Sequence, residues 1–346
     1  MESERILGQN HILRHFENAI RMGKISHAYI INGEEGSGKM NLAIHFAKAL
    51  QCERNNSNKA INEDGERITV PGTACGQCKS CKQTDSKNQP DIKYITYEKS
   101  GIGVDEIREQ INDDIDIKPY SSPYKIYIVP ESEKMTVQAQ NALLKTIEEP
   151  PEYAIIILLT TNADTFLQTI LSRCVMLNIR PVKEDIIKNQ LTSQYGVGDY
   201  EARVAATFSN GNPGKAIKLA TSEEFKELKQ YVVGMFMSLE KGGMDIIGEA
   251  IKKTGTFKKQ IDEYFSLMRI WFRDILVYKA TKEEDQIIFQ DEYMTIEKMS
   301  QTYSFDGIND ILKAIDLAES RIKSNVNFDS TIEILLLSIK EKTSGK

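Results

Sequence analysis

The strongest constraint on the fold is a glycine-rich segment, residues 33–40 (GEEGSGKM), which lies between two apolar stretches. The stretch before it, residues 28–31, is short and continuous, as in a buried strand. The stretch after it, residues 39–50, repeats apolar side chains at helical spacing. A strand, a glycine-rich turn and a helix in this order form a P-loop, in which backbone N–H groups surround a phosphate. The segment therefore predicts an α/β domain with a nucleotide-type loop.

The loop matches the P-loop pattern GxxxxGK[ST] at every position except the last. Its candidate nucleotide-binding residues are Gly33, Gly36, Gly38 and Lys39. Met40 stands where a Ser/Thr hydroxyl would hold Mg²⁺, and a thioether is a poor ligand for that hard cation. The sequence favours a weak or relic site, so ATP and Mg²⁺ are doubtful ligands, and it leaves open whether Lys39 still holds a nucleotide.

A second nucleotide element is also altered. Residues 125–129 (KIYIV) predict a buried strand, and such a strand in a working site ends in an Asp-Glu pair that holds Mg²⁺ and polarises water. Here the strand is followed by Pro130 and Glu131, so Glu131 remains as a candidate site residue and the aspartate is missing. Since two contacts to Mg²⁺ are absent, we do not expect this chain to hydrolyse ATP alone.

Strand and helix patterns alternate up to about residue 181, which predicts a parallel sheet with helices on both faces. The expected strands are 28–31, 91–97, 124–129, 154–160 and one ending near 179, and the expected helices include 39–50, 104–117 and 136–147. Beyond Pro181 the patterns are helical, at 184–195, 199–209, 215–220, 257–281, 307–324 and 330–340, and a capping-box pattern at Thr221 and Glu224 opens a further helix. We therefore expect an α/β domain over 1–181, a small helical domain over 182–222 and an all-α domain over 223–346.

Four of the five cysteines lie in the first quarter of the chain, and three of them fall within seven residues. Such a cluster in a chain without a signal peptide is typical of a metal site rather than of disulfides. Four thiolates at this spacing predict a closed, structural zinc site at 52–81. Reduced cysteines without metal and an iron–sulfur cluster are the alternatives. The candidate ligands are Cys52, Cys75, Cys78 and Cys81.

Charge and hydropathy argue against a freestanding nucleic-acid binder, a membrane protein and a secreted protein. The net charge is −6, from 44 basic and 50 acidic residues, without the basic excess of a freestanding nucleic-acid binder. A zinc-dependent nucleic-acid module acting alone is therefore disfavoured. The longest aliphatic run, 154–159, is far short of the ~20 residues of a membrane span, and the segment MESERILGQN is unlike a secretory signal. We expect a cytoplasmic protein.

Several segments together resemble the bacterial clamp-loader subunits of DNA polymerase III. They are residues 141–151 (NALLKTIEEPP), 158–162 (LLTTN) and 169–174 (TILSRC), with Leu7-Gly-Gln, His27-Ala-Tyr, the four cysteines and the turn at 211–214 (GNPG). The resemblance is strong over 1–180 and weaker beyond. It implies an AAA+ module with a small helical lid, followed by a helical collar that holds the subunits together.

Departures from that family pattern indicate which kind of subunit this is. The ATP-hydrolysing tau/gamma subunits keep Ser/Thr, Asp and Arg where this chain has Met40, Pro130 and Gly214. The pattern therefore looks like the non-hydrolysing stator subunit, an accessory of the polymerase holoenzyme that is not catalytic alone. Its implied partners are the tau/gamma and delta subunits in a hetero-oligomer, with the sliding clamp and primer-template DNA reached through the complex at the replisome. The alternative is an ATP-hydrolysing tau/gamma-type subunit that tolerates Met40 and Pro130 by using waters or Glu131.

The resemblance carries one more functional residue to this chain. Arg173, in Ser172-Arg173-Cys174, matches the position of an arginine finger that reaches the ATP of a neighbouring subunit. An arginine supplied in trans stabilises charge on the transferred phosphate because its planar fork binds two oxygens. The alternative is a surface arginine without a special role.

Overall fold

The computed structural model describes residues 6–56, 71–98, 101–241 and 245–343. The chain forms two compact units, each treated separately below. The first unit comprises residues 1–187 and 211–215, and the second comprises residues 188–210 and 216–346. The predicted division into three domains at 181 and 222 stays a prediction.

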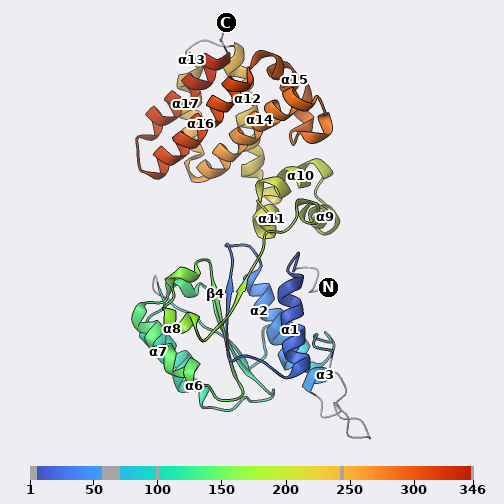
Figure 1. Ribbon diagram of the computed structural model, residues 1–346, viewed down its shortest axis with the longest axis vertical. Coiled ribbons are helices and arrows are strands. Elements are labelled where there is room, and N and C mark those ends of the chain that lie inside the picture. The colour runs from blue at the N-terminus through green and yellow to red at the C-terminus, as the bar shows by residue number, and fades with distance from the viewer. Residues whose placement is uncertain (1–5, 57–70, 99–100, 242–244, 344–346) are drawn as a thin grey trace. The chain divides into compact units, whose positions relative to one another are not determined.

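The first unit is built on a five-stranded parallel sheet, as the alternating pattern predicts (Figure 1). The strand order is β2-β3-β4-β1-β5. The central strand β4 is buried at all seven positions, because helices cover both of its faces. The bounds are β1 Ala28–Asn32, β2 Ile92–Tyr94, β3 Lys125–Val129, β4 Ala154–Thr160 and β5 Val175–Asn178.

Alternate residues of the strands supply two separate cores. On one face, Ile155 and Ile157 of β4 pack with α1 and α2; on the other, Ile156 and Leu158 pack with α7 and α8. Figure 1 shows these helices on opposite sides of the sheet. Their bounds are α1 Asn10–Met22, α2 Lys39–Gln51, α7 Val137–Glu148 and α8 Gln168–Leu171.

Two elements differ from the expected ones in the same region. Strand β2 is shorter than the expected 91–97, because the Gln110 side chain bonds both the N–H and the C=O of Thr96 in place of a further ladder pair. The expected helix 104–117 is divided into α5 Val104–Ile107, a π-helical turn Arg108–Asn112 and α6 Asp113–Ile115. The π turn contains Gln110, the residue that caps the strand.

Residues 53–74, expected as an inserted loop, begin with a short helix α3 (Glu53–Asn56). Residues 57–70 of that segment lie outside the described residues. The segment leads to α4 (Lys79–Asp85), which carries the last of the clustered cysteines.

The second unit is helical throughout its described residues. Its core surrounds Trp271, which is fully buried against Phe236 and Phe289. The helices that lie wholly or partly in it are α9 Glu184–Tyr195, α10 Asp199–Phe208, α11 Pro213–Thr221, α12 Glu223–Lys241, α13 Asp245–Thr256, α14 Ile261–Thr281, α15 Tyr293–Thr302, α16 Phe305–Lys323 and α17 Phe328–Thr343. Helices α13 and α15 are not among the expected ones. Among the described residues, no helix is long and apolar enough to cross a membrane.

Candidate functional site

The glycine-rich loop joins β1 to α2, as its sequence predicts. Gly36 and Gly38 have φ values of 79° and 95°, which residues with a side chain rarely adopt. Lys39 turns back on the loop, and its ammonium donates hydrogen bonds of 2.6 and 2.8 Å to the carbonyls of Gly33 and Glu34. The loop therefore uses its own backbone oxygens as partners for the lysine that would bind phosphate.

The electrostatic setting of this lysine is acidic. Burial lowers the pKa of Lys39, and the carboxylates of Glu133, Glu35, Glu131 and Glu34 act in the opposite direction. Four negative groups near one ammonium oppose the entry of a polyphosphate, which needs positive potential.

A turn from residues 211–215 lies directly on the loop. The Gly214 N–H donates to the Gly36 carbonyl at 3.1 Å, and the Asn212 amide donates to the Glu35 carbonyl at 2.7 Å. A Cβ added at Gly214 would lie 2.4 Å from that Gly36 oxygen. This approach leaves no space for the arginine that ATP-hydrolysing relatives are expected to carry at this position.

The candidate residue Glu131 follows the end of β3. Its backbone has φ of 46°, in the left-handed region, and its carboxylate accepts hydrogen bonds from Lys134 at 2.8 Å and from the Tyr97 hydroxyl. These two partners, Lys134 first, hold the pKa of Glu131 below its ordinary value. Glu131 is therefore hydrogen-bonded to local donors, although its negative charge still raises the pKa of Lys39.

Sequence reasoning missed Glu133 at this site. One of its carboxylate oxygens accepts from the Thr161 hydroxyl at 2.7 Å, and the other is buried without a hydrogen-bond partner among the described residues. Of the charges acting on Lys39, that of Glu133 has the largest effect. Its place just after β3, at the end of the sheet where the loop lies, is the signal that could have identified it.

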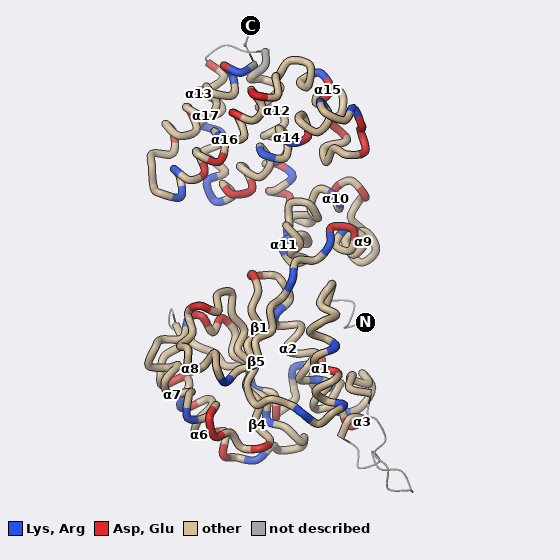
Figure 2. Tube along the Cα trace, viewed as in Figure 1, with Lys and Arg blue, Asp and Glu red and all other residues tan. Residues whose placement is uncertain are grey.

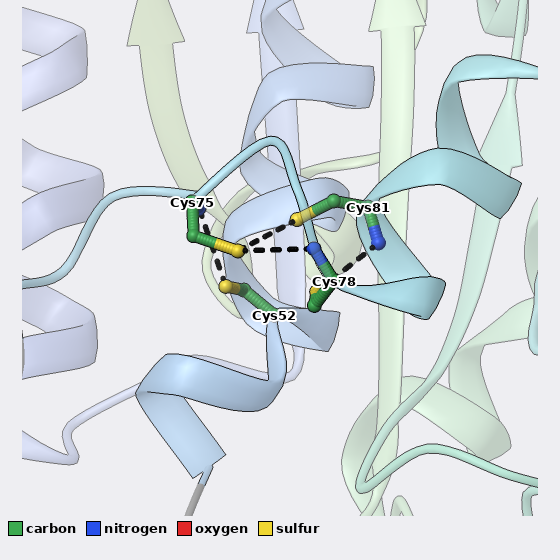
Figure 3. A group of neighbouring side chains, drawn as sticks. All are labelled: Cys52, Cys75, Cys78 and Cys81. Carbon is green, nitrogen blue, oxygen red and sulfur yellow. Dashed lines mark hydrogen bonds between the residues drawn. The ribbon is translucent and has the colours of Figure 1, made fainter.

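The four candidate metal ligands converge (Figure 3). Their sulfur atoms all lie within 4.8 Å of one another. A tetrahedral zinc with Zn–S bonds of ~2.3 Å requires sulfurs about 3.8 Å apart, and the Cys75 and Cys81 sulfurs are 3.9 Å apart. Cys52 comes from the end of α2, Cys75 and Cys78 come from the turn into α4, and Cys81 lies in α4 itself. The donor set and its spacing fit a zinc ion.

Backbone amides prepare part of this cluster for metal binding. The N–H groups of Cys75, Cys78 and Cys81 each point to a cysteine sulfur, at 3.3–3.4 Å. The backbone N–H groups of Gln77 and Cys78 lower the pKa of the Cys75 thiol to about 6, whereas burial raises the pKa of Cys52 and Cys81. Without a cation, burying thiolates at Cys52 and Cys81 is unfavourable, so these two buried thiols need a positive ion to become ligands together with the other two.

Arg173 lies at the opposite end of the sheet from the loop. It precedes β5, whose first residue, Val175, pairs with Tyr29 near the start of β1, whereas the loop follows the end of β1. Its guanidinium contacts Glu148 at 2.9 Å and the Thr169 carbonyl at 3.0 Å, and its side chain is 40% exposed. The structure therefore does not bring Arg173 to this chain's own loop.

The chain is similar to several known proteins. The chain is 26% identical to the DNA polymerase III subunit delta′ of Bacillus subtilis over 96% of each protein. It is 34% identical to the tau subunit of the same organism over 62% of this chain and 36% of that protein. A gamma-subunit-related protein of Thermotoga maritima of known structure aligns over 96% of this chain and 99% of that one, with 20% identity and a TM-score of 0.40.

Two family descriptions match the chain. "DNA polymerase III, delta subunit" matches residues 8–183, and "DNA polymerase III, delta subunit, C terminal" matches residues 248–341. The first alone covers more than half of the chain. The chain therefore belongs to the delta-subunit family of DNA polymerase III.

Proposed function

We propose that this chain is the delta′-type, non-hydrolysing subunit of the bacterial clamp loader, the complex that places the sliding clamp on primed DNA. The observation that carries the proposal is the closed phosphate loop. Its lysine is bound by the loop's own carbonyls, and the turn at 211–215 lies on its backbone. The partners in this proposal are tau/gamma and delta subunits, with the clamp and primer-template DNA reached through the complex.

The ligands that hydrolysis requires are missing at three separate positions. Met40 cannot hold Mg²⁺ as a hydroxyl would, Pro130 offers no carboxylate, and Gly214 offers no cation. The carboxylates around Lys39 further oppose binding of a triphosphate. A loss at one position could be compensated by water, but the three losses affect metal, water activation and phosphate charge together.

Arg173 acts, in this proposal, on the ATP of a neighbouring subunit. Its place at the far end of the strands separates it from this chain's own loop. Its ion pair with Glu148 is half exposed, and such pairs contribute only ~0–1 kcal/mol, so the guanidinium is free to exchange partners. An arginine finger contributes ~10³–10⁵ in rate where it has been measured.

The four-cysteine cluster acts as a structural zinc site. Four thiolates fill a tetrahedron and leave no open position for catalysis. The metal would join the end of α2, the helix that follows the phosphate loop, to the start of α4. The zinc therefore supports the loop region and takes no part in a reaction.

The test measures ATP use by the isolated chain and by the assembled loader. We expect calorimetry to detect no Mg²⁺-dependent ATP binding to the wild-type chain or to Lys39→Ala. In the loader, Lys39→Ala should leave DNA-stimulated phosphate release unchanged. Arg173→Ala should remove the share of that release contributed by the one neighbouring site, because a ~10³-fold loss silences this site and leaves the others active. Arg173→Lys keeps the charge and should not restore the rate.

The opposite result identifies the alternative function. Tight ATP binding and hydrolysis by the isolated chain, lost in Lys39→Ala, would make it an ATP-hydrolysing tau/gamma-type subunit. Full activity of the Arg173→Ala loader would remove the role in trans.

A further inference from the structure

The end of α13 and the turn after it carry four lysines that the proposed function does not use. They are exposed, and residues 250–261 contain no acidic side chain. Elsewhere along the trace, basic and acidic positions are largely interspersed (Figure 2). We call this group the lysine patch: Lys252, Lys253, Lys258 and Lys259.

The lysine patch is not neutralised by ion pairs among the described residues. Other basic side chains of the same unit do have carboxylate partners. Lys226 contacts Glu223 at 2.7 Å, and Lys342 contacts Asp310 at 2.8 Å. The four ammonium groups therefore keep their full charge toward solvent.

Aromatic rings hold two of these lysines in place. The Lys253 ammonium lies 5.7 Å from the centre of the Phe257 ring, and the Lys258 ammonium lies 4.6 Å from that of Phe328. Phe257 in turn stacks on Tyr231 at 5.3 Å. A cation–π contact positions an ammonium without cancelling its charge, unlike a salt bridge. The rings thus limit the movement of two charges while leaving them available to an anion.

Acidic residues lie beside the patch, and Glu224 accepts a hydrogen bond of 2.9 Å from Gln260, the residue after Lys259. Glu249 lies one turn earlier on α13, Asp262 and Glu263 begin α14, and Asp329 follows the ring of Phe328. Asp262 is already 3.6 Å from the ammonium of Lys323. Lys252 and Lys253 lie near the end of α13, and Lys258 and Lys259 lie in the short 3-10 turn that follows it. The four lysines fall within eight residues of the chain, so they act on a partner as one charged surface.

We propose that the lysine patch binds the sugar–phosphate backbone of a nucleic acid. Ammonium groups bind phosphates as point charges and do not read bases, so the contact is independent of sequence. Half-buried aromatic rings lie beside the lysines. They favour a nucleic acid over an acidic protein segment as the partner, because protein surfaces that bind nucleic acid combine basic and aromatic side chains. The site goes beyond the proposed function, which gives this chain no direct contact with DNA.

Fluorescence anisotropy of the full chain with a labelled oligo-dT and with a labelled hairpin duplex tests the patch. The test variant replaces all four lysines by glutamine. The control variant makes the same substitution at four scattered, exposed lysines and so has the same net charge: Lys24, Lys118, Lys218 and Lys313. Both variants should have the wild-type thermal midpoint.

Salt dependence gives the expected magnitude. Each phosphate contact to a single strand adds ~0.7 to the slope of log affinity against log salt, so four contacts add ~2.8. Between 50 and 200 mM salt, the wild type and the control variant should lose about 50-fold more affinity than the patch variant. A larger effect with oligo-dT than with the duplex would identify the single strand as the preferred form.

Two outcomes would overturn the proposal. One is an equal salt slope in the wild type and the patch variant. The other is patch-dependent binding of a labelled polyglutamate without patch-dependent binding of either DNA, which would assign the surface to an acidic protein segment. The assay contains no ATP and no other subunit, so its failure is separate from failure of the Arg173 experiment.

Discussion

Replacing Gly214 by alanine measures how closely the turn at 211–215 rests on the phosphate loop. The new Cβ would lie 2.4 Å from the Gly36 oxygen, against 3.4 Å for ordinary contact, so the turn must retreat by about 1 Å. That movement breaks the Gly214–Gly36 hydrogen bond and stretches the one from Asn212 to Glu35. Two such bonds contribute ~1 kcal/mol each, and alanine returns at most ~1 kcal/mol through helix propensity. We expect the first unit to lose about 1 kcal/mol.

Gly234 provides the matched control for this substitution. It lies within α12, where an added Cβ meets nothing within 4 Å, so Gly234→Ala should gain ~0.5–1 kcal/mol. Urea unfolding followed by circular dichroism reports both units, whereas the fluorescence of Trp271, the single tryptophan, reports the second unit alone. Gly214→Ala should lower the first transition and leave the Trp271 signal unchanged. A Gly214→Ala protein as stable as the wild type would refute the contact.

Three further perturbations test the core and the metal site. Phe46→Ala removes a fully buried ring stacked 4.0 Å from Phe16, and urea unfolding should show a loss of ~3–5 kcal/mol; a loss below ~1 kcal/mol would mean that the site is not packed as described. In the metal-free chain at pH 7, iodoacetamide should label Cys75 well before Cys174, because backbone donors lower the pKa of Cys75 to about 6 and burial raises that of Cys174 to about 12. Because the fold favours the Cys75 thiolate, the contribution of this thiolate to stability is complete above the pKa of an unfolded thiol and is lost as the pH falls through about 6. Labelling of Cys75 should slow over the same pH range. Equal labelling rates for Cys75 and Cys174 would contradict the lowered pKa of Cys75. Elemental analysis should find one zinc per wild-type chain and a deficit in Cys52→Ser, whose thermal midpoint should no longer respond to a chelator.

Much of the fold could be predicted because its signals are local. The strand 154–160 is an unbroken β-branched and aliphatic run, and the loop at 33–40 fixes what precedes and follows it. Helix α13 could not be found in the same way. It contains Gly248 and Gly255, which lower helix propensity, and its buried face is short, so packing in the second unit stabilises it rather than its own sequence.

In the candidate site too, the residues predicted from the sequence are those with a local signal. The cysteine spacing predicted a cluster that the structure places within metal-binding distance, because three of its members lie on one turn. Glu133 was missed because its effect on Lys39 depends on how β3 ends beside the loop, and no spacing rule relates two residues 94 positions apart. A single sequence does not show which residues from different strands lie close together at the end of the sheet.

Gly214 illustrates how one substitution can be interpreted in two ways. From the sequence it is a loss, since a cation that would contact phosphate is missing. In the structure it is also a gain, because an added Cβ would lie 2.4 Å from the Gly36 oxygen, so only a residue without Cβ lets the turn lie on the loop. In a nucleotide-binding module the ligand connects loop and lid, whereas here Gly214 and Asn212 contact the loop backbone directly. The same glycine that removes a phosphate contact thus lets the turn bind the loop backbone directly within the first unit.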